Sequence, residues 1–208
     1  MLESPLSRYA GAIALVAGIL VIASRVVLMT TPAHIDALKV FVLSGTFAIN
    51  SIVSITAYAL LALALVAIYE REARPASTLG VVGLAAAMIG TVFMAGDWWF
   101  EAFAVPRLAE IAPDVMDTWI GGRLFVGGVS SFVLFGLGWA LFGIASLRAR
   151  VMPGRIAAAI LAGGLLSGVP IGVAYLTGGV ILGLAVAWAG VWMTRSRAVS
   201  AAGQPAVT

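Results

Sequence analysis

Long stretches of this sequence carry no charged side chain, and this limits the folds open to the chain more than any other feature. A helix needs about 20 mostly apolar residues to cross the hydrocarbon core of a bilayer. Only 10% of the residues are charged, whereas a soluble domain is about one quarter charged. We therefore predict an all-α integral membrane protein, with one transmembrane domain over residues 1–197 and a disordered cytoplasmic tail over 198–208. Six segments qualify as spans: about 8–29, 40–69, 79–104, 120–147, 156–176 and 178–194.

The distribution of basic residues predicts how this six-helix bundle of up-and-down hairpins is oriented. Eight of the twelve Lys and Arg residues fall on the side that holds both chain ends, and four fall on the other side. Because positively charged loops stay cytoplasmic, we expect both termini in the cytoplasm and the protein in the plasma (inner) membrane. The first span could instead be a signal peptide. Its positive region is weak and no convincing cleavage site follows, so we expect it to remain as a helix.

Small residues at helical spacing predict close contacts of the last two helices with each other or with their neighbours. In lipid, the hydrophobic effect contributes little to the association of helices, so the helices associate through close contact of their backbones. We expect the fifth and sixth helices to form a tight hairpin that turns at 175–179, and Pro170 to kink the fifth helix. The small residues recur at intervals of four: Gly164, Gly168 and Gly172 on the fifth helix, and Gly179, Gly183 and Ala187 on the sixth.

Polar side chains inside the predicted membrane region define a candidate polar pocket. On the second helix they are four residues apart and therefore form one stripe. At 1.5 Å per residue, Arg25, Asn50 and Asp97 lie at one depth, about 26–28 Å above the cytoplasmic ends of their helices. Ionisable residues are costly in a membrane and mark a pairing, a cavity or a path. The candidate residues are Arg25, Thr46, Asn50, Ser54, Tyr58, Asp97 and Glu101.

Three interpretations of this candidate polar pocket stay open. In the structural one, Arg25 pairs with Asp97 and nothing binds, because charged groups near a helix end reach the interface cheaply. In the second, the pocket is open to the outside, and Arg25 would take an anion or the two acids a cation. In the third, Asp97 and Glu101 relay protons.

The segment around these acids is rich in aromatic residues, which are typical of the outer membrane interface. Tryptophan is enriched at the level of the lipid headgroups, so we interpret Trp98 and Trp99 as interfacial anchors. The loop over 105–119 has apolar residues at roughly helical spacing and predicts a short amphipathic helix on the outer surface. Asp114 is expected to cap the N-terminus of the fourth helix.

Several kinds of chemistry find no support in the sequence. Without cysteine, the chain has no disulfide, thiol nucleophile or cysteine-bound metal. Its one histidine, His34, lies in a loop beside Pro32, and no spacing around it indicates a metal site. The nucleophile, phosphate-binding and dinucleotide motifs of soluble enzymes are missing. We expect no catalytic residue, no cofactor, no metal and no binding of nucleic acid.

Two stretches resemble a known family. One runs from Gly138 to Ala149 and is followed by Met152-Pro153-Gly154-Arg155, and the other is Phe100 to Pro106 with Ala112-Pro113. They resemble, respectively, the junction between the fourth and fifth helices and the loop after the third helix of small uncharacterised six-helix membrane proteins common in actinobacteria. The resemblance implies a six-helix bundle in the plasma membrane. It brings no established activity, and no catalytic residue is carried over.

The sequence leaves three functions open. The first is a non-enzymatic accessory or scaffold bundle, with membrane lipids and a protein partner or a second copy as its contacts, and with a place as a subunit of a membrane complex. The second is a binder or transporter of a lipid or small molecule that uses an outward-facing polar pocket. The third is an intramembrane enzyme that modifies a lipid or isoprenoid, with Asp97 or Glu101 as its acid. The balance of the sequence is against an enzyme.

Overall fold

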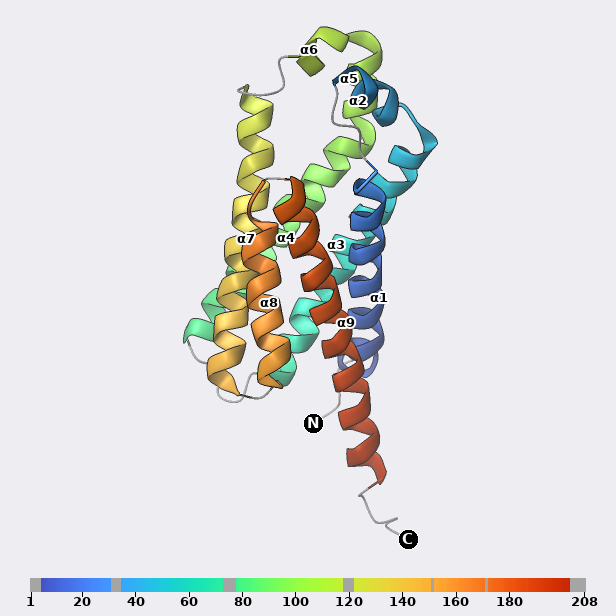
Figure 1. Ribbon diagram of the computed structural model, residues 1–208. Coiled ribbons are helices and arrows are strands. Elements are labelled where there is room, and N and C mark those ends of the chain that lie inside the picture. The colour runs from blue at the N-terminus through green and yellow to red at the C-terminus, as the bar shows by residue number, and fades with distance from the viewer. Residues whose placement is uncertain are drawn as a thin grey trace.

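The computed structural model describes residues 5–30, 35–72, 78–117, 122–150, 152–170 and 172–202, and the regular elements within them are all helices. Figure 1 shows the long helices side by side, with three short ones gathered at one end. The long helices are α1 (Pro5–Leu28), α3 (Gly45–Glu72), α4 (Thr78–Phe103), α7 (Arg123–Ala149), α8 (Gly154–Ser167) and α9 (Gly172–Ala202). The short helices are α2 (Ile35–Val42), α5 (Val105–Ile111) and α6 (Pro113–Asp117).

Five of the long helices, α1, α3, α4, α7 and α9, are long and apolar enough to cross a membrane. The remaining one, α8, is also apolar but has 14 residues, fewer than the roughly 20 that a straight span needs. The composition and the helix lengths therefore agree on an all-α chain built to lie in a membrane.

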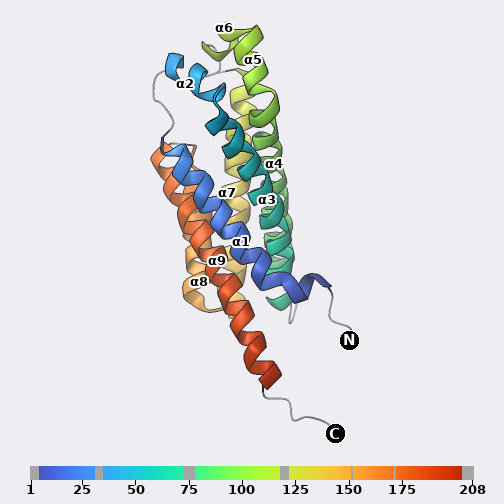
Figure 2. The ribbon, with the colours of Figure 1, turned by 90° about the vertical axis from the view of Figure 1, so that its right-hand side faces the viewer.

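The long helices pack as a closed ring in the order α1, α3, α4, α7, α8, α9 and back to α1. Figure 2 shows α1, α8 and α9 on one side of the molecule and α3, α4 and α7 on the other. Helix α1 begins and α9 ends at the same end of the ring, opposite the end that carries α2, α5 and α6. Between the helices lie fully buried large side chains, among them Tyr58, Met94, Phe135 and Trp139.

Glycine lets the helix backbones of this ring touch. A Cβ at Gly18 of α1 would lie 2.3 Å from the carbonyl oxygen of Gly183 of α9, and Gly18 also meets Ala187. The predicted stripe on the last helix is therefore confirmed, and its partner is α1. Gly164 and Gly168 pack on α7. The predicted third member of their stripe, Gly172, instead begins α9 and has nothing within 4 Å of its Cβ position.

The second predicted span is two helices and not one. Helix α2 ends at Val42 and α3 begins at Gly45, with Ser44 between them. The backbone N–H of Phe47 donates to the hydroxyl of Ser44 at 3.2 Å, and that hydroxyl donates to the carbonyl of Phe41 at 2.6 Å. A serine that accepts a bond from an N–H in the first turn is an N-cap, and it starts α3 afresh. The predicted second span is confirmed from Gly45 onward, but its predicted start at residue 40 was wrong because this local signal was overlooked.

The last hairpin turns earlier than predicted. Helix α8 ends at Ser167 and α9 begins at Gly172, so 175–179 is helical and Pro170 lies in the connection, where it kinks nothing. Proline has no backbone N–H to donate, so a helix stops most cheaply before it. As a result the α8–α9 turn lies lower in Figure 1 than the ends of α4 and α7 that carry α5 and α6.

The segment between α4 and α7 and the C-terminal end of α9 also differ from the prediction. The segment after α4 is helical as predicted, but in two pieces, and Asp114 lies in the first turn of α6. It does not cap the fourth long helix, because α7 begins at Arg123 after Gly122. Helix α9 continues to Ala202, so the first residues of the predicted disordered tail are helical, and 203–208 lie outside the described residues. His34 lies outside them as well.

Gly138→Ala should destabilise the fold. The added Cβ would lie 2.4 Å from the carbonyl oxygen of Ala86, a backbone atom that cannot turn aside. Overpacking of this kind costs about 1–3 kcal/mol, which would lower the thermal unfolding midpoint in detergent by several degrees, as followed by tryptophan fluorescence. The matched control is Gly96→Ala on α4, where nothing lies within 4 Å and alanine favours the helix. Equal midpoints for the two variants would contradict the packing.

Candidate functional site

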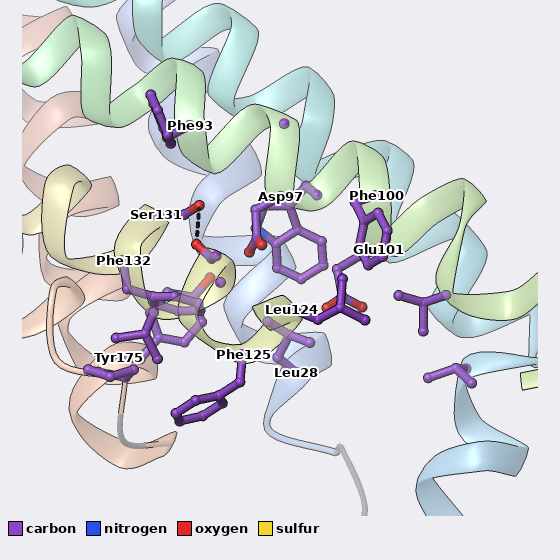
Figure 3. A pocket seen from close by; sticks show the side chains of 18 of the residues that line it. Leu28, Phe93, Asp97, Phe100, Glu101, Leu124, Phe125, Ser131, Phe132 and Tyr175 are labelled. Carbon is purple, nitrogen blue, oxygen red and sulfur yellow. Dashed lines mark hydrogen bonds between the residues drawn. The ribbon is translucent and has the colours of Figure 1, made fainter. Parts of the chain in front are cut away.

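A cavity of about 1060 Å³ lies at the end of the bundle that carries α2, α5 and α6 (Figure 3). Its wall is contributed by α1, α2, α3, α4, α5, α7 and α9 and by the α8–α9 connection. Most of the lining side chains are aliphatic or aromatic. They include Leu28, Leu38, Phe41, Val42, Phe47, Phe93, Trp98, Phe100, Val105, Leu124, Phe125, Phe132 and Tyr175.

The cavity exists because α4 and α7 touch along only part of their length. A Cβ at Gly90 of α4 would lie 2.4 Å from the backbone of Leu134, so the two helices are in contact there. Six residues further along α4, nothing lies within 4 Å of a Cβ at Gly96, and the same holds for Gly127 of α7. A Cβ at Gly128 would meet one atom, Oδ1 of Asp97 at 3.7 Å. The helices therefore diverge toward this end.

The early turn of the last hairpin leaves this space unfilled. Pro170 of the connection and Tyr175 of α9 both line the cavity, so the hairpin contributes part of its wall but does not reach through it. The rings of Tyr175 and Phe132 pack edge to face, 4.6 Å apart. Toward α2, a small cluster of Val42, Phe47 and Val105 with their neighbours covers the cavity.

Two carboxylates face this apolar space. Asp97 and Glu101 are one helical turn apart on α4, and both line the cavity. Figure 3 shows both side chains extending from α4 on the same side as Leu124 and Leu28. Within the described part of the chain, no ion pair joins either carboxylate to a basic side chain. Arg123, the first residue of α7, also lines the cavity and is exposed.

Arg25 lies behind the cavity wall, in a box of aromatic rings. Its side chain is 1% exposed, and its Nη2 donates to the hydroxyl of Tyr58. Its guanidinium carbon lies 4.2 Å from the ring centre of Tyr175, 5.7 Å from that of Trp98 and 5.8 Å from that of Tyr58. A guanidinium held within about 6 Å of aromatic faces is stabilised by their quadrupoles. Gly179 supplies the space, since a Cβ there would lie 2.5 Å from Nε of Arg25.

The predicted polar pocket is therefore divided into two sites. Asp97 and Glu101 belong to the cavity, whereas Arg25 and Tyr58 belong to the buried aromatic box. The predicted pairing of Arg25 with Asp97 was wrong: Nε and Nη1 of Arg25 have no hydrogen-bond partner among the described residues. Trp98 separates the two sites, because it both lines the cavity and faces Arg25.

The polar stripe of α3 faces mainly the interior and not the cavity. The Ser54 hydroxyl lies 2.6 Å from that of Ser24 on α1, so this pair ties the two helices together. Asn50 is 2% exposed, and neither of its amide atoms has a partner within the described chain. Thr46 is exposed and is not part of the cavity wall. Of the stripe, Ser54 therefore joins two helices, and Tyr58 belongs to the aromatic box.

Sequence reasoning missed Trp98 and Tyr175 as members of the site. Trp98 was interpreted as an interfacial anchor, but it is buried, whereas Trp99 is 57% exposed and fits that interpretation. Helical periodicity carries the signal: Trp98 follows Met94 and Thr91 at intervals of four and three, so it shares their buried face. Tyr175 was hidden by the wrong position of the hairpin turn.

The polar residues of the cavity wall limit the chemistry that the cavity can support. Asp97 and Glu101 are two potential metal ligands, and within the described residues no third His, Cys, Asp or Glu joins them. Ser131 also lines the cavity, but its hydroxyl donates to the carbonyl of Gly127, 3.2 Å away in its own helix. The site as it stands is suited to hold a molecule with an apolar body.

Gly179→Ala should disturb the aromatic box. The new Cβ would force the buried side chain of Arg25 out of its position between Tyr58 and Tyr175, at a cost of about 1–3 kcal/mol. We expect a lower thermal unfolding midpoint than for the wild type. Gly172→Ala on the same helix is the control, since nothing lies within 4 Å of its Cβ position. An unchanged midpoint in Gly179→Ala would show that Arg25 is not held by this packing.

Comparisons with protein-family models, with curated proteins and with solved structures found no match for the chain. No relative therefore supplies a role for any of these residues.

Proposed function

We propose that the protein is a six-span membrane protein whose outward-facing cavity binds an amphiphile, that is, a lipid or another small molecule with an apolar body and a polar head. The observation that carries this proposal is the cavity of about 1060 Å³ with a largely apolar and aromatic wall. Ligand cavities are typically about 300–1,000 Å³ and combine such a wall with a few placed polar groups.

The polar groups of the cavity suit an amphiphile better than a wholly apolar molecule. Asp97 and Glu101 lie close together on one helix, whereas phenylalanine and leucine side chains form much of the remaining wall. A head bound at the carboxylates would leave the apolar body among rings such as Phe125 and Phe132. Phe93 of α4 lines the cavity and is also 49% exposed. Its exposure supports sideways entry from the membrane between α4 and α7.

The fold supports the proposed orientation and the sixth span. Helices α8 and α9 form a hairpin whose arms contact each other and close the ring, so α8 follows the course of a span in spite of its 14 residues. Helix α1 begins and α9 ends at one end of the bundle, which supports an even number of passages. Arg148 and Arg195 lie toward that end. The positive-inside rule then favours this end as the cytoplasmic one, with the cavity outside.

The two other functions stay predictions. A scaffold role would need a partner surface, and the exposed apolar faces of the helices are equally suited to lipid. An enzyme would need its acids to act on a bound substrate, so it too starts from binding in this cavity. Binding is therefore the function that the site supports best.

Gly128→Leu should abolish binding by filling the cavity. The first added atom would make an ordinary contact of 3.7 Å with Asp97, and the rest of the side chain would extend beside it into the space. The full chain would be released from nanodiscs of phosphatidylethanolamine and phosphatidylglycerol and weighed by native mass spectrometry. The wild type should retain bound lipid after the bulk lipid is stripped, and Gly128→Leu should retain at least one molecule fewer.

The matched control is Gly154→Leu at the start of α8, where nothing lies within 4 Å. It adds the same side chain at the opposite end of the bundle and should leave lipid retention unchanged. Identical retention in all three proteins would count against a ligand in the cavity.

A further inference from the structure

Resting on that proposed function, we propose that the cavity selects amphiphiles whose polar head is an ammonium group, and that Asp97 and Glu101 hold this group. The starting point is the charge of the wall. An unpaired charge in apolar surroundings is costly, because the protein supplies nothing in place of the lost water. Two such carboxylates side by side raise that cost further. A ligand that carries a positive charge lowers the cost, whereas an anionic head raises it.

The basic groups near the cavity do not cancel these two charges. Arg123 is exposed at the outer end of α7, and no ion pair links it to either carboxylate within the described residues. Arg25 stands behind Trp98 and Tyr175, where it donates to Tyr58 and faces three aromatic rings. The wall therefore holds two neighbouring acids, Asp97 and Glu101, and one exposed basic residue, Arg123, which within the described chain pairs with neither of them.

The aromatic part of the wall favours the same ligand. Trp98, Phe100, Phe132 and Tyr175 line the cavity together with the acids. Ring faces attract ammonium groups within about 6 Å, and aromatic cages of this kind recognise quaternary ammonium ligands. Tyr175 and Trp98 already hold one cation on the far side, the guanidinium of Arg25.

The first experiment compares two probes that differ in one atom. Decyltrimethylammonium and its neutral analogue, with carbon in place of the nitrogen, are titrated against the full chain in uncharged dodecylmaltoside and followed by calorimetry. The ammonium probe should bind the wild type at least tenfold more tightly than the neutral one. Asp97→Asn and Glu101→Gln should each remove about tenfold of this preference, which is about 1.4 kcal/mol, since each removes one carboxylate that faces the ammonium charge.

Asp114→Asn is the matched control. It removes an acid from α6 at the same end of the molecule, outside the cavity wall, and should keep the full preference for the ammonium probe. The thermal midpoint of each variant without probe shows whether it is folded. The two acids are changed one at a time to isosteric amides. If one variant does not fold, the other still tests whether an acid is needed for the ammonium preference.

The second experiment identifies the source of the ammonium group. Native mass spectrometry compares retention of phosphatidylethanolamine and phosphatidylglycerol with the same acyl chains. Preference for phosphatidylethanolamine that is lost in Asp97→Asn identifies a lipid headgroup. Equal retention of the two lipids, with the probe preference intact, identifies a free amphiphilic amine.

The outcomes separate this inference from the proposed function. Equal affinity for both probes, abolished by Gly128→Leu, would overturn the ammonium head and leave amphiphile binding in place. Tighter binding of decyl sulfate than of decyltrimethylammonium would overturn it as well. Probe binding that Gly128→Leu does not change would overturn the cavity as a binding site altogether.

Discussion

Direct contact between helix backbones is the interaction on which the rest of this structure depends. In lipid, two apolar helices gain little by hiding their side chains from each other, so their attraction comes from close packing. The ring meets this need with glycine opposite backbone, as at Gly18 against Gly183 and at Gly138 against Ala86. Where such contacts cease, as beyond Gly90 on α4, the helices separate and the cavity begins.

The buried Arg25 shows how the same packing accommodates a charged group whose burial costs free energy. Arg25 has one hydrogen bond, to Tyr58, and two nitrogen atoms without partners among the described residues. Three aromatic faces surround it, and a glycine of α9 admits the width of its side chain. The free-energy cost of removing the guanidinium charge from water is offset mainly by the quadrupoles of the rings and not by a carboxylate. The acids nearby thus stay available to the cavity.

Sequence patterns predicted the class of the fold well and the contents of the site only in part. Hydropathy identified the long apolar helices, because their composition is fixed by the solvent they must lie in. Local signals at helix ends were harder to recognise among the apolar residues. The N-cap at Ser44 starts α3 later than predicted, and Pro170 places the last turn earlier than predicted. Depth counting placed Arg25 and Asp97 at one level, but it says nothing about which way a side chain points. Their separation by Trp98 depends on helix rotation, which tertiary packing decides.

The glycines of α4 give its two halves opposite tolerance to change. At Gly90 no side chain of any kind fits, so mutation there meets the rigid backbone of α7. At Gly96 the space is open, and a new side chain alters the cavity wall without touching the packing below. The part of the molecule that maintains its shape is thereby separated from the part that forms the cavity wall. Under selection, single substitutions could change the shape and polarity of the cavity while the scaffold stays unchanged.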